Sequence, residues 1–244
     1  MSYLMYLLLF LSVMVSGMSV LFINISSKSL KLFLSFSGSF LFSISVLHLI
    51  PELYHPVESG ADHSSIGIYI LIGFFAQILL EFFSEGIEHG HIHIHQEDHG
   101  KNVFPFAMML GLSIHSFLEG MPLADMTTTV HRSLLTGIIL HNIPIAIALM
   151  TMLLQSGVSK KNAIFWLLIF AFITPLGAFT SYAIGSNIIG NFSHYFDRIM
   201  AVVVGIFLHI STTILFESSE NHRFNLIKFL VIILGAGIAV AGIG

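Results

Sequence analysis

The sequence predicts an all-α, polytopic membrane protein with eight transmembrane helices. Of the 244 residues, 55% are hydrophobic and 9% are charged, and the mean hydropathy is +0.91. Soluble domains carry about 25% charged residues. Eight apolar runs follow one another along the chain, and a spanning helix needs about 20 such residues. We therefore expect 1–244 to form a single transmembrane domain, embedded in the lipid bilayer, with no room for a large soluble domain.

The eight runs are nearly free of charged residues: Tyr3–Asn24, Leu32–Ile50, Ile66–Leu80, Val103–Leu118, Leu134–Leu154, Ala163–Ile184, Ile199–Phe216 and Leu226–Ile243. The first run lacks a basic n-region and a cleavage site, so we expect a retained helix rather than a secretion signal. The third and fourth runs are short, and we expect them to extend through Glu81 and Gly120. Small residues such as Gly177 in the sixth run favour close helix packing.

The distribution of Lys and Arg predicts the orientation. The odd-numbered connections contain seven of them (Lys28, Lys31, Lys101, Lys160, Lys161, Arg223 and Lys228), and the even-numbered connections contain two (Arg132 and Arg198). Because positively charged loops stay in the cytoplasm, we expect both termini on the extracytoplasmic side of a plasma or inner membrane. The net charge of -4 and the lack of a basic block argue against a nucleic-acid partner.

Few polar side chains with metal-ligating atoms occur within the runs. They are His48 with Glu52, His115 with Glu119, His141 with Asn142, and His209 with Glu217. A charged group in mid-membrane costs roughly 2.5 to 3.5 kcal/mol, so each needs a partner or a use. For a single histidine, a hydrogen bond between helices explains the residue as well as a function does.

Spacing and depth bring His115, Glu119 and His141 together. Residues four apart lie on one helix face, so His115 and Glu119 point into the same space. At about 1.5 Å per residue, His115 lies about 21 Å from Lys101 and His141 about 14 Å from Arg132, measured from opposite faces. Both imidazoles then reach mid-membrane. We predict a metal site between the fourth and fifth spans, where the next turn contains Pro144, which we expect to open the fifth helix.

The donor set indicates which metals fit. Two imidazole nitrogens and a carboxylate suit Zn²⁺, Fe²⁺ or Mn²⁺, and Cd²⁺ is also tolerated, whereas Ca²⁺ and Mg²⁺ prefer oxygen ligands. The absence of cysteine excludes thiolate ligands. His48 and Glu52 lie near the interface and are candidates for a pathway role, as is His209.

A histidine-rich stretch, "EHGHIHIHQEDH", lies between the third and fourth runs, in a predicted cytoplasmic loop of about residues 85–101. Its alternating histidines fit no helical face. Mobile histidines bind divalent metals weakly, so the loop is a candidate for metal capture or sensing, and an idle solvated loop is the alternative. The candidate ligands are His89, His91, His93, His95 and His99.

Together these motifs resemble the ZIP family of divalent-metal transporters. They are "HLIPE" closing the second span, the histidine-rich loop, "HSFLEG" on the fourth span, "HNIPIA" on the fifth and "GIFLHISTTILFE" on the seventh. The resemblance covers nearly the whole chain, and "HSFLEG" is the most specific motif. It implies uptake of zinc or iron-like ions toward the cytoplasm by a transporter, not an enzyme, with the metal as substrate rather than cofactor. Homodimers are frequent in the family.

The resemblance also assigns His115, Glu119 and His141 as the main metal ligands. Family members with two adjacent metals have further ligating side chains at three positions that are Ser116, Asn142 and Ile145 here. We therefore expect one transport site, with Ser116 and Asn142 at most auxiliary.

Two other functions are open. An intramembrane zinc-dependent hydrolase would use the metal to activate water, but it needs a third strong ligand and a general base, and no H-E-x-x-H motif occurs. A metal sensor would bind ions through the loop without moving them across the membrane.

Overall fold

The computed structural model describes residues 3–54, 63–84, 105–124, 129–185, 196–217 and 225–242, and all regular structure within these ranges is helical. This confirms the all-α prediction. The elements are α1 (Tyr3–Ser19), α2 (Ser27–Ile44), a π-helical segment η1 (Ser45–Leu49), α3 (Ile50–Leu53), α4 (His63–Ser84), α5 (Phe106–Gly120), a 3₁₀ segment η3 (Met121–Ala124), α6 (Thr129–Gln155), α7 (Lys160–Ala171), α8 (Ile173–Gly185), α9 (Phe196–Glu217) and α10 (Leu226–Ala241).

These helices account for each predicted span. Within the described ranges, six segments are long and apolar enough to cross a membrane: Ser27–Leu53, Ser65–Phe83, Phe106–Leu123, Arg132–Gln155, Lys160–Ile184 and Phe196–Leu215. The first and last spans, α1 and α10, are shorter apolar helices of 17 and 16 residues. As predicted, α4 and α5 extend through Glu81 and Gly120. The architecture is that of a multi-pass membrane protein.

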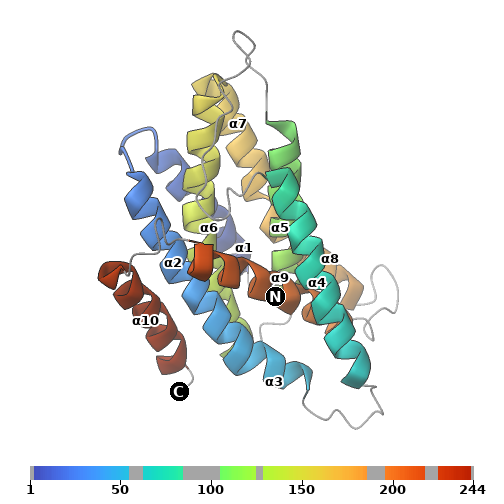
Figure 1. Ribbon diagram of the computed structural model, residues 1–244. Helices are drawn as coiled ribbons and strands as arrows, with labels where there is room; N and C mark the ends of the chain where they lie inside the picture. The colour runs from blue at the N-terminus through green and yellow to red at the C-terminus, as the bar shows by residue number, and fades with distance from the viewer. Residues whose placement is uncertain are drawn as a thin grey trace.

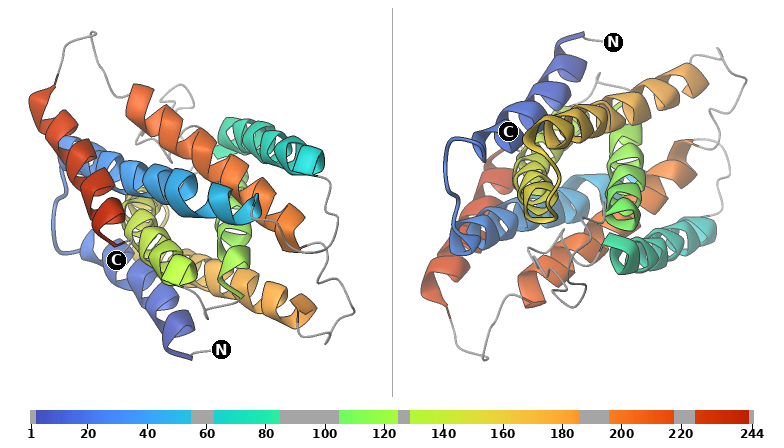
Figure 2. Two further views of the ribbon diagram at one scale, coloured as in Figure 1. Left: turned by 90° about the horizontal axis from the view of Figure 1, so that it is seen from below. Right: turned by 90° about the horizontal axis from the view of Figure 1, so that it is seen from above.

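The bundle places α6 in its interior and α4 and α10 at opposite edges (Figure 1 and Figure 2). Burial agrees with this arrangement, because 72% of the apolar window of α6 is buried, against 17% of that of α4. At one edge α10 packs mainly against α2, and at the other α4 packs mainly against α9. The helix that contains His141 is therefore the one most shielded from lipid.

The apolar core consists of two clusters, and the polar residues of α5 and α6 lie between them along each helix. In α6, Leu134 and Ile138 belong to one cluster and the stretch 145–153 contributes to the other. In α5, Leu112 belongs to the second cluster, and Leu123 of the following turn belongs to the first. His115, Glu119 and His141 thus occupy a boundary between two packed regions.

Prolines shape two of the spans. The second span widens into η1, where the Ile50 N–H reaches back to the Ser45 carbonyl. We attribute this to Pro51, since its ring would collide with the carbonyl four residues earlier in a regular α-helix. The sixth span breaks between α7, which ends at Ala171, and α8, which begins at Ile173. We attribute this break to Pro175, since its ring would collide with the carbonyl of Ala171, four residues earlier, in a regular α-helix.

The prediction for Pro144 is wrong in one respect. Pro144 has no N–H to donate to the Leu140 carbonyl, but α6 runs from Thr129 to Gln155 without a break. The packing of α6 against α1 and α2 holds the helix together through this point. A freed carbonyl is therefore not accompanied by an opened helix.

A close approach between α5 and α8 fixes the position of the fourth span. A Cβ added at Gly120 would collide with the Thr174 carbonyl, and one added at Gly177 would collide with the Phe117 carbonyl. The two backbones therefore touch because glycine occupies both positions, as the small residues of the sixth span predict. This contact lies within one turn of Glu119.

Candidate metal centre

Three fully buried side chains converge between α5 and α6. They are His115 and Glu119 from α5 and His141 from α6. One ligand atom from each lies within 4.8 Å of the other two. His115 Nε2 is 3.6 Å from Glu119 Oε2, and the two imidazole rings lie 5.9 Å apart at 88°. In the described part of the chain, this is the one group of three or more His, Cys, Asp or Glu side chains close enough to hold a metal ion.

The positions of these side chains agree with the spacing argument. His115 and Glu119 lie one turn apart on one face of α5, and His141 meets them from α6. The two helices are not a closely packed pair, however, because α5 packs mainly against α8 and α4, and α6 mainly against α1 and α2. The three side chains extend across the space between the two helices, and the other neighbours of each helix hold its backbone in place.

The spacing of the donor atoms suits a small divalent cation. Bonds of about 2.0–2.1 Å to zinc put neighbouring tetrahedral ligand atoms about 3.3–3.4 Å apart. The His115–Glu119 separation of 3.6 Å is close to this value, and the limit of 4.8 Å for the whole set is somewhat wider. A buried carboxylate is costly without a positive partner, and a bound divalent cation would supply one.

The neighbouring polar residues are also buried. Ser116 and Asn142 are fully buried, and neither the Ser116 hydroxyl nor the Asn142 side-chain amide has a hydrogen-bond partner in the described part of the chain. An unsatisfied buried polar group costs about 1–3 kcal/mol. Ile145, by contrast, packs into an apolar cluster with no exposed surface. The residues that replace the second set of family ligands are therefore two polar groups and one core residue.

His48 and Glu52 lie apart from this group. His48 is in the π-helical segment η1 and Glu52 in α3, and both are partly buried. His48 Nε2 and Glu52 Oε2 have no hydrogen-bond partner among the described residues. The two residues could bind a cation near the end of the second span, but no third ligand joins them within the described ranges.

His209 has a partner that the sequence did not indicate. His209 Nε2 lies 2.6 Å from Glu81 Oε2, so the pair joins α9 to α4. The Phe74 ring packs edge-on against His209, with ring centroids 4.9 Å apart. In the sequence His209 was grouped with Glu217, whose side chain lies outside the described set. Glu81 was missed because 128 residues separate it from its partner.

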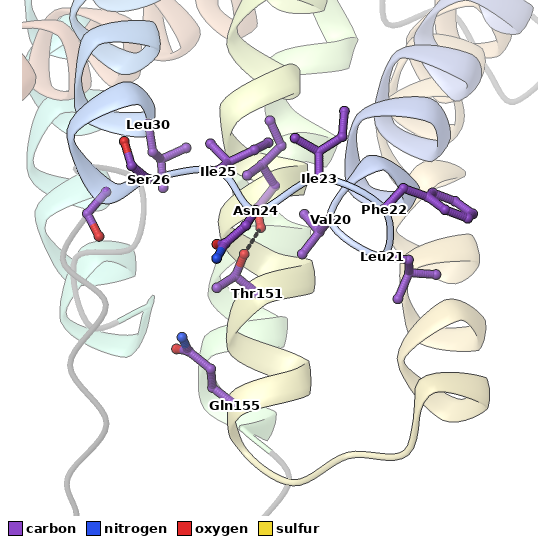
Figure 3. Close-up of a pocket in the computed structure, with 12 residues that line it drawn as sticks. Val20, Leu21, Phe22, Ile23, Asn24, Ile25, Ser26, Leu30, Thr151 and Gln155 are labelled. Carbon is purple, nitrogen blue, oxygen red and sulfur yellow. Dashed lines mark hydrogen bonds between the residues drawn. The ribbon is translucent and has the colours of Figure 1, made fainter.

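Two other features do not contribute ligands. The loop histidines, His89 to His99, lie outside the described residues. A pocket of about 590 Å³ lies between the segment 20–27 and α6 (Figure 3). Its polar side chains include Asn24, Thr151 and Gln155, and none of its lining residues is His, Cys, Asp or Glu. This neutral pocket is separate from the metal centre.

The fold and the centre together define a class of protein, namely a polytopic membrane protein that presents a buried His/Glu/His group to a divalent cation. A family model described as "ZIP Zinc transporter" matches residues 87–241. This range includes His115, Glu119 and His141. The chain belongs to the ZIP zinc transporter family. Members of this family are transporters.

Curated relatives agree with this assignment. The chain is 28% identical to protein zntD of Dictyostelium discoideum over 173 residues, which cover 65% of this chain and 25% of zntD. It is 23% identical to zinc transporter ZIP9-B of Xenopus laevis over 209 residues (69% and 67%). It is 29% identical to zinc transporter ZIP1 of Danio rerio over 159 residues (62% and 51%). The chain thus spans between a quarter and two thirds of the length of these relatives.

Proposed function

We propose that this protein transports Zn²⁺ across the membrane toward the cytoplasm through a single site formed by His115, Glu119 and His141, with Fe²⁺ and Mn²⁺ as further substrates. The observation that supports this most strongly is the convergence of three fully buried ligands from two membrane helices. A metal site on the protein surface does not need fully buried ligands. It suits a cation that passes through the protein.

The ligand set favours an intermediate affinity, at which the site can both capture the cation and release it. Three protein ligands leave at least one position of a tetrahedral ion for water. Conduction through a protein requires such intermediate affinity.

The flanking residues favour one ion rather than two. Ser116 and Asn142 are buried next to the ligands in sequence and can hold water or bind the ion weakly. Ile145 is an apolar core residue and offers no ligand atom. We therefore assign Ser116 and Asn142 an auxiliary role.

The remaining assignments follow the orientation predicted from Lys and Arg. With both termini extracytoplasmic, His48 and Glu52 lie toward the outer face, where they capture the cation. His209 lies toward the inner half, and the histidine-rich loop binds metal at the cytoplasmic mouth. Assembly as a homodimer stays a prediction based on the family.

The test is zinc uptake by proteoliposomes that contain the purified protein in defined orientation. We expect the double variant His115→Ala/Glu119→Ala to lose uptake, because only His141 remains. Ile114→Ala is the matched control, since Ile114 lies on the same helix with 40% of its surface exposed. Undiminished uptake by the double variant would remove the assigned site.

A second arm of the same experiment separates transport from sensing. Deletion of residues 88–99 should leave uptake within about twofold of the wild type, because a loop that only captures ions is not part of the path through the membrane. A sensor predicts no uptake by any variant. Competition by Fe²⁺ and Mn²⁺ in the same vesicles would rank the substrates.

A further inference from the structure

Ser37 of α2 lies against one of the metal ligands. Its hydroxyl oxygen is 3.5 Å from His141 Nδ1, one of the two ring nitrogens. Both residues have no exposed surface, and α2 packs along α6 at this point.

The other hydrogen bond of Ser37 determines which group donates. A serine hydroxyl has one proton and two acceptor lone pairs. The Ser37 hydroxyl donates to the Leu34 carbonyl at 3.2 Å. With its proton used there, Ser37 meets His141 only as an acceptor, so Nδ1 of His141 carries the proton. In a neutral imidazole the other nitrogen, Nε2, then has the free lone pair.

This arrangement distinguishes Ser37 from the other buried serines of α2. Ser35 donates to the Lys31 carbonyl and Ser39 donates to the Phe36 carbonyl, each within its own helix. Neither of them contacts a ligand of the metal centre in the hydrogen bonds of the described residues. Ser37 alone of the three adds a contact to His141.

We propose that Ser37 is a positioning residue for metal binding, which holds the His141 ring in the tautomer with a proton on Nδ1 and so presents Nε2 to the cation. The inference rests on the function proposed above and adds a residue from a third helix to the site. Partners of this outer kind fix the tautomer and orientation of metal-binding histidines, and their loss typically weakens metal binding 10- to 100-fold. Because the contact is long, we expect about tenfold, at the lower end of that range.

The test uses two variants of equal shape, Ser37→Thr and Ser37→Val, which differ only in the hydroxyl group. The zinc concentration for half-maximal uptake should rise about tenfold for Ser37→Val and return to near the wild-type value for Ser37→Thr. Ser35→Ala is the control for loss of a buried serine that bonds only within α2. Equal values for Ser37→Thr and Ser37→Val would overturn the proposal, since shape rather than the hydroxyl would then matter.

A spectroscopic measurement makes the proposal independent of transport and of the stability of the variants. In zinc-free wild-type protein labelled with ¹⁵N-histidine, long-range ¹H–¹⁵N correlation should show the proton of His141 on Nδ1, with His141→Gln used for assignment. A proton on Nε2 would overturn the inference. This failure differs from failure of the proposed function, which would appear as undiminished uptake by His115→Ala/Glu119→Ala.

Discussion

Two pairs of histidine and glutamate in the described part of the chain are alike in composition and differ in geometry. His115 Nε2 and Glu119 Oε2 are 3.6 Å apart on one helix, whereas His209 Nε2 and Glu81 Oε2 are 2.6 Å apart on two helices. The first distance is beyond a good hydrogen bond, and the second is that of a short, charge-assisted one. The separation in the first pair is close to that of two ligand atoms on one metal ion, whereas the two residues of the second pair hydrogen-bond to each other.

The surroundings of the two pairs support the same distinction. At the first pair a third ligand, His141, completes a group with ligand atoms within 4.8 Å. At the second pair an aromatic ring, Phe74, packs against the imidazole, and the side chains are 10% and 23% exposed. A His–Glu pair within a membrane span is therefore not by itself a metal site. The number of ligand atoms and the spacing between them decide whether such a pair can hold a metal ion.

The largest expected effect separates the two carboxylates. Glu119→Gln keeps the shape of the side chain and removes its charge, so zinc uptake should fall by at least about 100-fold, above the range for outer-shell partners. Glu81→Gln should leave uptake within a few fold, because His209 and Glu81 bind each other rather than the ion at the main site. Proteoliposome uptake of ⁶⁵Zn²⁺ measures both. Equal losses would show that the two pairs do not differ in role.

A smaller effect on zinc uptake is expected from moving α5 relative to α8. Gly177→Ala forces a methyl group against the Phe117 carbonyl, two residues from Glu119, which should cost about 1–3 kcal/mol and weaken zinc binding about tenfold. The matched control is Gly237→Ala on α10, where an added Cβ meets nothing within 4 Å. Half-saturation of uptake is the measurement. If both variants match the wild type, the α5–α8 contact does not position the site.

The smallest effect concerns the tie between α4 and α9. A double-mutant cycle with Glu81→Gln and His209→Phe should give a coupling energy of about 0.6 to 1.7 kcal/mol in the free energy of unfolding, the range found for hydrogen bonds between membrane helices. The corresponding cycle with Glu119 and His115 should give less, because their separation of 3.6 Å makes a poor hydrogen bond. A larger coupling in the second cycle would contradict the comparison.

The grouping of His115, Glu119 and His141 was predictable from the sequence because its geometry is mostly local. His115 and Glu119 are four residues apart on a helix, and the depth of His141 follows from the count of residues to the nearest charge. The extension of α4 and α5 followed from the length needed to cross lipid. The break before Pro175 obeys the same proline rule that was applied to Pro144, so the sequence contained that signal too.

The other features depend on packing between distant parts of the chain. No spacing rule links Glu81 to His209, since which faces of α4 and α9 meet is decided by the whole bundle. The contact of Ser37 with His141 likewise requires the register of α2 on α6. Pro144 shows the converse, because tertiary packing kept α6 continuous where the local rule predicted an opening.

The transport site proposed here is tested most directly by X-ray absorption of zinc bound to protein in which the loop histidines, His89, His91, His93, His95 and His99, are replaced by serine. We predict a first shell of nitrogen and oxygen at about 2.0–2.1 Å with two imidazoles, and loss of one imidazole in His141→Ala. A shell without imidazole, or a spectrum unchanged by His141→Ala, would contradict the claim that His115, Glu119 and His141 hold the transported ion.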